Sequence, residues 1–203
     1  MSLSAALFLA GLVTLSAALP YQESCRQLPA KHDFNVQAYY SGKWYGTHTY
    51  SPSAPGEQKM GVCASTKAEI LQTLVRTQYS VYVPDVDQYM YSEGFISLHY
   101  FEQGVAKFVE EARIVDKDGK PVIKEFVAEP LTLIDTDYLN YSILYFCTTK
   151  DNGQVISAYT ILSRYQDAEH VHPNVEVVLK RIGLKLDDFA SIKGLKCKED
   201  PNF

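Results

Sequence analysis

The sequence predicts an all-β protein, an antiparallel barrel or sandwich, with one α-helix near its C-terminal end. Three observations indicate this. Between residues 43 and 164, short segments rich in aromatic and β-branched residues follow one another at close, regular spacing. Turn-forming residues separate these segments. After residue 164 the apolar residues change to the spacing of a helix.

Eight or nine strands are predicted in the β-rich region. The first, Lys43–Tyr50, is followed by the breaker-rich segment Ser51-Pro52-Ser53-Ala54-Pro55-Gly56, which indicates a long loop. Asp118-Gly119 and Asn152-Gly153 are pairs typical of type I′ hairpin turns. The other predicted strands are Gly61–Ala68, Leu71–Val83, Gln88–Tyr100, Ala106–Val115, Pro121–Val127, Leu131–Asp135, Tyr141–Thr148 and Val155–Arg164.

One helix is predicted near residues 173–182. Its apolar residues fall at i, i+3, i+4 and i+7, which places them on one face. Pro173 suits the first turn of this helix, and Gly183 suits its C-terminal cap. The residues on the apolar face are Val175, Val178, Leu179 and Ile182.

The N-terminal residues 1–18 have the pattern of a signal peptide. The apolar run Leu7–Leu15 is too short to span a bilayer, and Ser16-Ala17-Ala18 supplies small residues for cleavage. Residues 19–203 then form a single domain, and we expect a secreted, extracellular protein with no membrane span. The net charge of −5, without a basic run, gives no indication of a nucleic-acid partner.

Four cysteines follow the predicted cleavage site: Cys25, Cys63, Cys147 and Cys197. An even number of cysteines in an exported chain predicts two disulfides. Their wide spacing fits no zinc-ligand pattern, so no metal site is expected from them. The residues alone leave three pairings open.

Three short motifs occur in a fixed order: Gly42-Lys43-Trp44, Thr136-Asp137-Tyr138-Leu139-Asn140-Tyr141 and Leu162-Ser163-Arg164. Together they resemble the lipocalin family over almost the whole mature chain. This resemblance implies an eight-stranded antiparallel up-and-down barrel with one flanking C-terminal α-helix. It also implies that Trp44 plugs the closed end, that Arg164 lies against its indole, and that Thr136, Asp137 and Tyr138 form a turn at that end.

The cysteine positions resemble those of arthropod lipocalins of the bilin-binding and crustacyanin type. That resemblance implies the disulfides Cys25–Cys147 and Cys63–Cys197.

The lining of the barrel can be predicted by counting every second residue from Trp44, Cys147 and Arg164. His48 is the only predicted lining residue with candidate chemistry: a hydrogen bond to a neighbouring tyrosine, contact with a ligand carboxylate or propionate, or ligation of a haem iron. The loop Ser51–Gly61 is expected at the mouth. The predicted ligand-binding residues are Gly46, His48, Tyr50, Ser142, Leu144, Phe146, Ala158 and Thr160.

His170 with His172, Asp85 with Asp87, and Asp135 with Asp137 are the side-chain pairs that could be considered as metal ligands. His170 and His172 are expected in a solvated loop, and Asp135 and Asp137 are accounted for by the turn, so no metal site is predicted. Asn140-Tyr141-Ser142 is a glycosylation sequon whose occupancy is left open. No catalytic motif is present, and a thiol enzyme would need a free cysteine, for which Cys63 is the nearest candidate. The chain is therefore not expected to be an enzyme.

The segments Cys25–Pro29 and Asn35–Tyr45 resemble bilin-binding proteins, crustacyanins and apolipoprotein D. This resemblance implies that the chain carries or sequesters a small hydrophobic ligand, such as biliverdin, a carotenoid, a retinoid, a sterol or a fatty acid. No cofactor is required, and a receptor or protein partner that contacts the loops is left undetermined.

The alternative rests on the segment Leu184–Phe189, which resembles nitrophorins and the triabin group. It implies a salivary lipocalin that scavenges biogenic amines, nucleotides or haem, or that inhibits clotting or platelet activation. One observation counts against haem: the strand position that would align with the nitrophorin proximal histidine falls near Val81, and no histidine lies there. An amine would need a carboxylate at the mouth of the barrel to pair its ammonium, and Glu57 in the first loop is the only nearby candidate.

Overall fold

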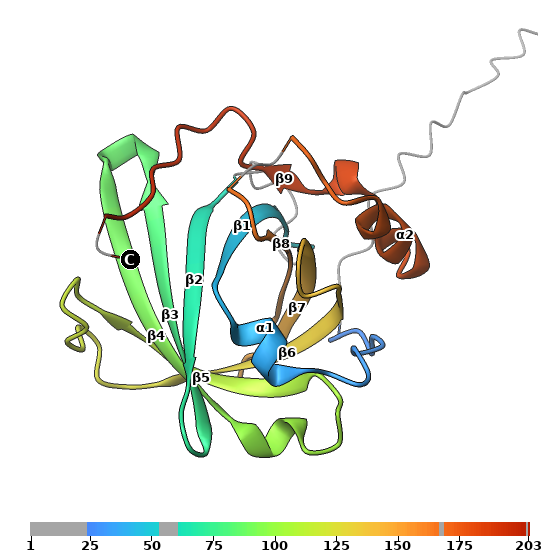
Figure 1. Cartoon of the computed structure of the whole chain (residues 1–203), viewed down its shortest axis with the longest axis horizontal. Coiled ribbons are helices and arrows are strands. Elements are labelled where there is room, and N and C mark those ends of the chain that lie inside the picture. Colours follow the sequence, from blue (N-terminus) through green and yellow to red (C-terminus); the bar gives the residue numbers. More distant parts are fainter. Residues whose placement is uncertain (1–23, 53–60, 167–168, 202) are drawn as a thin grey trace, which may run out of the picture.

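Eight antiparallel strands close into an up-and-down barrel, in which each strand pairs with the next along the chain (Figure 1). β1 pairs with both β8 and β2, which closes the ring. The strands are β1 (Lys43–Tyr50), β2 (Cys63–Ile70), β3 (Leu74–Val83), β4 (Gln88–Ser97), β5 (Lys107–Val115), β6 (Val127–Thr136), β7 (Tyr141–Thr149) and β8 (Val155–Ser163). The predicted fold class is confirmed.

The computed structural model describes residues 24–52, 61–166, 169–201 and 203. The predicted signal peptide 1–18 lies outside the described residues, as does Glu57 with most of the predicted mouth loop Ser51–Gly61. Within the described ranges, no helix has the length and apolar character needed to cross a bilayer.

The predicted strand Pro121–Val127 is wrong, because this segment does not form a ladder. Pro121 makes one isolated bridge to Val115, and the N–H groups of Val122 and Ile123 both donate to the same carbonyl, that of Ile114. The paired strand begins only at Val127 and continues to Thr136.

The two glycine turns form, but the predicted type I′ geometry is also wrong. Among the turn residues only Gly119 and Gly153 have positive φ, +76° and +82°, whereas a type I′ turn needs two such residues. Each glycine instead closes a four-residue turn with its N–H: Gly119 donates to the carbonyl of Asp116, and Gly153 donates to the carbonyl of Lys150.

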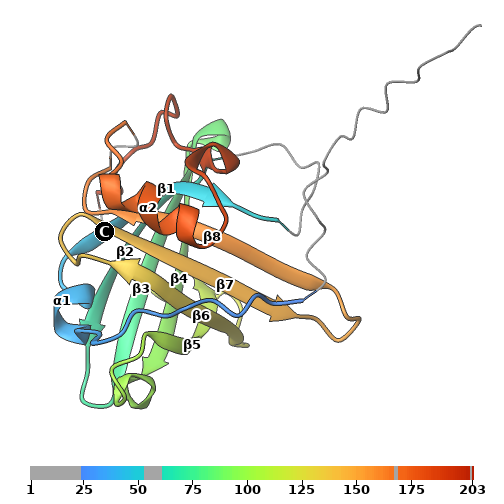
Figure 2. The same ribbon diagram turned by 90° about the vertical axis from the view of Figure 1, so that its right-hand side faces the viewer.

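Helix α2 (Pro173–Arg181) packs against the outside of the barrel, as Figure 2 shows. Val175, Val178 and Leu179 are buried in a cluster that includes Tyr159 and Ile161 of β8. The predicted helix is confirmed, and burial of its apolar face holds it to the wall. Several short elements were not predicted: helix α1 (Val36–Tyr40), strand β9 (Ala190–Ser191), which pairs with β1, and the 3-10 helices η1 (Pro84–Val86), η2 (Leu98–Phe101) and η3 (Leu186–Asp188).

The closed end of the barrel is sealed by Trp44. Its side chain is 3% exposed, its indole N–H donates to the carbonyl of Tyr39 at 2.8 Å, and the guanidinium carbon of Arg164 lies 3.6 Å from its ring centroid. At the same end, the Asp137 carboxylate accepts backbone N–H groups from Leu139 to Tyr141. The roles implied for Trp44, Arg164 and the Thr136–Tyr141 turn agree with this geometry.

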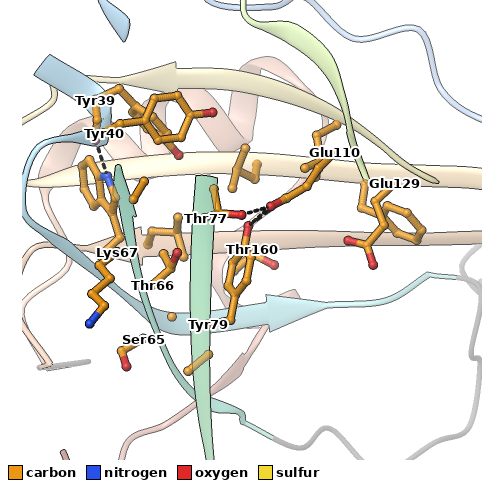
Figure 3. A pocket seen from close by; sticks show the side chains of 18 of the residues that line it. Tyr39, Tyr40, Ser65, Thr66, Lys67, Thr77, Tyr79, Glu110, Glu129 and Thr160 are labelled. Carbon is orange, nitrogen blue, oxygen red and sulfur yellow. Dashed lines mark hydrogen bonds between the residues drawn. The ribbon is translucent and has the colours of Figure 1, made fainter. Parts of the chain in front are cut away.

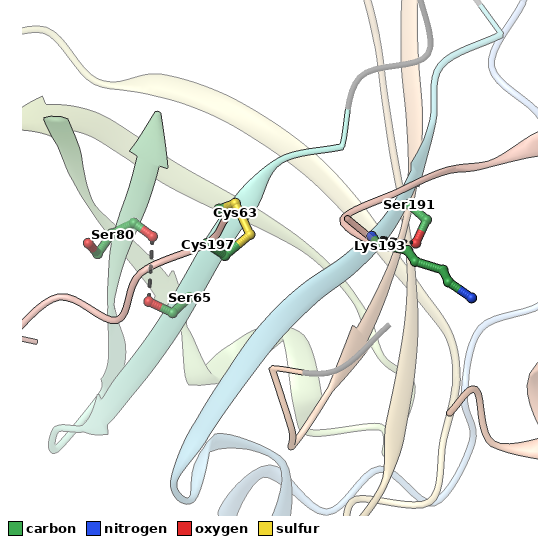
Figure 4. Close-up of a disulfide and its surroundings, with 6 residues drawn as sticks. All are labelled: Cys63, Ser65, Ser80, Ser191, Lys193 and Cys197. Atoms are coloured by element: carbon green, nitrogen blue, oxygen red, sulfur yellow. Dashed lines mark hydrogen bonds between the residues drawn. A yellow bond between two sulfur atoms is a disulfide. The ribbon is translucent and has the colours of Figure 1, made fainter. Parts of the chain in front are cut away.

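Two disulfides fasten the ends of the chain to the barrel wall. Cys25 of the N-terminal segment bonds to Cys147 of β7, and Cys63 of β2 bonds to Cys197 of the C-terminal segment (Figure 4). The described part of the chain has no free cysteine. The pairing implied by the family resemblance is the one observed.

Candidate functional site

A cavity of about 400 Å³ lies inside the barrel. Its apolar lining comes from most of the strands, and its polar lining is concentrated on α1 and on β2, β3, β5 and β6. The apolar residues are Trp44, Val62, Ala64, Ala68, Ile96, Phe108, Leu131, Leu144, Phe146, Ala158 and Leu162, and the polar ones include Tyr39, Tyr40, Thr77, Tyr79, Glu110 and Glu129. A mostly apolar cavity of this volume suits a small organic ligand.

Five of the eight predicted ligand-binding residues line this cavity: Gly46, Leu144, Phe146, Ala158 and Thr160. Ser142 is in the same inward phase of β7, but it is not among the residues that line the cavity. It is fully buried, and its hydroxyl lies 3.1 Å from the Tyr39 hydroxyl, within hydrogen-bond distance. Contact of these residues with a ligand remains a prediction.

The inward orientation predicted for His48 and Tyr50 is wrong, because β1 contains a bulge. The register of β1 with β8 shifts between Gly46 and His48, so Thr47 is an extra residue and the phase inverts. His48, 6% exposed, lies 3.0 Å from the Thr47 hydroxyl, and burial lowers its pKa. Tyr50 packs on Phe189 outside the cavity, and Thr49 takes the inward position.

The carboxyl group of Glu110 is the main polar feature of the cavity (Figure 3). The residue is only 1% exposed, and its oxygens accept hydrogen bonds from the hydroxyls of Thr77 and Tyr79, the latter at 2.7 and 2.9 Å. Burial raises the pKa of this carboxyl above its ordinary value.

Gly94 on β4 leaves the space that the Glu110 carboxyl occupies. A Cβ atom added at Gly94 would lie 2.0 Å from a Glu110 oxygen and 2.6 Å from the Thr77 hydroxyl. The carboxyl is therefore positioned from three strands: β5 supplies it, β3 donates to it and β4 makes room for it.

A second carboxyl, Glu129, lies directly across from Glu110 in the pairing of β5 with β6. Burial raises the pKa of Glu129 as well, and its charge raises that of Glu110. Like charges at facing positions destabilise a sheet, so this pair favours a cation between or beside them. Lys67, a cationic residue of the lining, lies instead over the ring of Phe203, 4.6 Å from its centroid.

Neither carboxylate was predictable from strand alternation alone. The inward phase can be fixed only in a strand that carries a recognised motif or cysteine, and β5 and the first half of β6 carry none. One signal was available in the predicted strand Ala106–Val115: Glu110 and Glu111 are adjacent, so the alternation of a strand turns one of them inward.

Two tyrosines of α1 extend from the closed end into the cavity (Figure 3). The Tyr39 hydroxyl is paired with Ser142. The Tyr40 hydroxyl is buried and has no hydrogen-bond partner among the described residues. Burial raises the pKa of both phenols, so both are uncharged at neutral pH.

The sequon residue Asn140 lies in the β6–β7 turn and is half-buried. Its side-chain amide donates to the Asp137 carboxylate at 2.7 Å, which would have to open for a sugar to be attached. Its glycosylation remains a prediction.

The lining does not fit a histidine-ligated haem, the cofactor implied by the nitrophorin resemblance. No histidine is among the described residues around the cavity. Within the described ranges, no three His, Cys, Asp or Glu side chains cluster as a metal site.

Comparisons with known proteins point to one group. The Nitrophorin family matches residues 25–203. Pallidipin from Meccus pallidipennis is 28% identical, over 87% of this chain and 89% of its own length. The solved tryptamine complex of the amine binding protein of Rhodnius prolixus has a TM-score of 0.74 and 26% identity, covering 87% of this chain and 90% of that one. Insecticyanin from Manduca sexta, at 20% identity, 83% and 85% coverage and a TM-score of 0.61, shares the fold.

Proposed function

The chain belongs to the Nitrophorin family of lipocalins, and we propose that it is a secreted protein that sequesters a small organic amine in its barrel. The apolar part of the amine would fill the cavity, and its ammonium group would bind the Glu110 carboxylate. The protein would act by holding its ligand and not by converting it.

The observation that carries this proposal is the buried carboxyl of Glu110. Burying a charge without a partner is costly, so buried carboxylates are normally paired with a cation. Among the described residues, no lysine, arginine or histidine forms an ion pair with Glu110 or Glu129. A ligand ammonium would supply the missing positive charge, in a cavity whose other walls are mostly apolar.

The similarity to an amine-binding protein supports the same ligand class. That protein was solved with tryptamine, a molecule with an apolar ring system and one primary amine. The cavity described above offers complementary chemistry: apolar walls for a ring and a carboxylate for an amine.

An uncharged apolar ligand, such as a sterol or a retinoid, is the second candidate, and the apolar lining favours it. The anionic members of the predicted ligand set fit less well. A fatty acid, the propionates of biliverdin or the phosphates of a nucleotide would place further negative charge beside Glu110 and Glu129. A role for the loops in binding a clotting or platelet protein is a separate proposal that the cavity does not address.

Calorimetric titration of the purified protein with tryptamine tests the proposal. We expect Glu110→Gln to weaken binding about 10- to 100-fold, because a hydrogen bond to a charged group contributes about 1.5–3 kcal/mol. Glu111→Gln, on the exposed face of the same strand, is the matched control and should leave affinity unchanged. Binding of retinol or cholesterol without binding of any amine would reject the proposal in favour of the second candidate.

A further inference from the structure

The carboxyl group of Glu129 is a second negative point in the cavity, and the described part of the chain gives it no partner. Glu129 lines the cavity from β6 and is half-buried (Figure 3). Within the described ranges its side chain makes no hydrogen bond and no ion pair, whereas the hydroxyls of Thr77 and Tyr79 hold the Glu110 carboxyl. The Glu129 oxygens also remain accessible, because neither is among the described polar atoms that are enclosed without a partner. A ligand in the cavity can therefore reach this carboxyl.

The two carboxyl groups start from facing residues but end at different places on the wall. Glu110 extends from β5 over Gly94 of β4 to the Thr77 hydroxyl of β3. Glu129 belongs to β6, on the other side of β5. Strands β4 and β6 are two strand spacings apart, which is about 10 Å along a sheet. The hydrogen bonds of Glu110 thus draw its carboxyl away from Glu129, and the wall presents two separate negative points.

One ammonium group on Glu110 would leave the second carboxylate uncompensated. Among the described residues, no cationic side chain pairs with either group. A buried carboxylate without a partner is costly, and an ionised carboxylate can only accept hydrogen bonds. Its complement is a donor, and a positively charged donor gives the strongest bond. Apolar side chains, Leu131 and Phe146, line the cavity from β6 and β7.

We propose that Glu129 is a specificity-determining residue that binds a second basic nitrogen of the ligand. This inference rests on the proposed amine function and deepens it. The preferred ligand is then a diamine, whose two ammonium groups bind Glu110 and Glu129 and whose apolar linker lies against the walls. The apolar walls alone would favour the opposite, because a monoamine of the same length buries more apolar surface. A preference for the diamine therefore reports the second carboxylate.

Two pairs of amines that differ by one amino group test this proposal by calorimetric titration: cadaverine against pentylamine, and para-xylylenediamine against para-methylbenzylamine. We expect the wild-type protein to bind the diamine of at least one pair about tenfold more tightly than its monoamine. Glu129→Gln should abolish that preference and leave the affinity for the monoamine within about twofold. Retained binding of the monoamine also shows that the variant is folded.

Glu125→Gln is the matched control, because it makes the same change of charge at an exposed residue just before β6. It should keep the wild-type preference. Three results would overturn the inference while leaving amine binding intact: no preference for either diamine, a preference that survives Glu129→Gln, or an equal loss of monoamine and diamine affinity in that variant. If none of the four amines binds, the proposed function fails, and this inference fails with it.

Discussion

Arg164 and Trp44 form the floor of the barrel through two kinds of contact. The guanidinium stacks on the indole, and it also donates hydrogen bonds to several backbone carbonyls of the chain that crosses the closed end. Those carbonyls belong to Ala38, Tyr39, Ser41, Lys43 and Tyr138. A planar cation with several fixed donors is needed for this geometry, which lysine could not reproduce.

Trp44→Ala should therefore destabilise the protein by about 3–5 kcal/mol, since it removes a buried aromatic side chain and leaves a void against Arg164. Urea unfolding followed by circular dichroism measures the loss. Tyr165→Ala, an exposed aromatic two positions from the end of β8, is the control and should change stability little. A Trp44→Ala protein as stable as wild type would mean that the indole does not seal the barrel.

Residue types at the closed end were predictable because they serve the fold. Gly42, with φ of +66°, needs the left-handed region just before β1, and the Asp137 turn needs a side-chain acceptor for three backbone N–H groups. Such local requirements leave short motifs in the sequence. Tyr40 and Glu110, which line the cavity, meet no such backbone requirement and leave no comparable motif.

The β5–β6 pair is the element that sets the charge of the cavity. Glu110 and Glu129 face each other across it, and the pKa of each is raised above the ordinary carboxyl value of 4.5. Because a raised pKa means that folding disfavours the charged form, these groups stabilise the unliganded fold at low pH. That contribution is lost as the pH rises through the raised pKa values.

Amine binding should show the opposite dependence on pH, because an ammonium ligand needs the ionised carboxylate. As the pH falls through the raised pKa of Glu110, affinity should drop by up to about tenfold per pH unit. This loss should begin at a higher pH than the one at which an exposed glutamate titrates. Titration calorimetry between about pH 8 and pH 5 measures this. The Glu110→Gln protein should show a flatter profile, and a wild-type profile already flat over this range would contradict the assignment.

The bulge in β1 explains why strand counting succeeded for some walls and failed for another. β7 and β8 pair without interruption, so the phase taken from Cys147 and Arg164 holds for Phe146, Ala158 and Thr160. In β1 one extra residue inverted the phase for His48 and Tyr50. A bulge depends on the pairing of two strands, and neither strand alone shows it.

The two disulfides act at the scale of the whole chain, joining residues 122 and 134 positions apart. Around Cys197, further contacts hold the C-terminal segment to the wall: the Tyr45 hydroxyl donates to Glu199 at 2.6 Å, and the Ser80 hydroxyl donates to Asp200 at 3.0 Å. The described ends of the chain are thus fixed to the barrel covalently and by hydrogen bonds.

Replacing Cys63 and Cys197 together by alanine should lower the free energy of unfolding by about 4–5 kcal/mol, from the greater entropy of the unfolded chain. Urea unfolding of this variant beside the Cys25/Cys147 double variant measures both contributions, which should be similar. Peptide mapping without reduction provides an independent check, and a peptide that links Cys25 to Cys63 would contradict both pairings.

A barrel whose floor is sealed by Trp44 and α1 has a consequence for how much ligand one chain can remove. The cavity of about 400 Å³ has room for one small molecule, and nothing in the proposed action releases it in altered form. A protein of this kind acts stoichiometrically, because each chain removes one ligand molecule from solution. Once the dissociation constant lies well below the ligand concentration, tighter binding adds little, and the quantity of protein delivered decides how much free ligand remains.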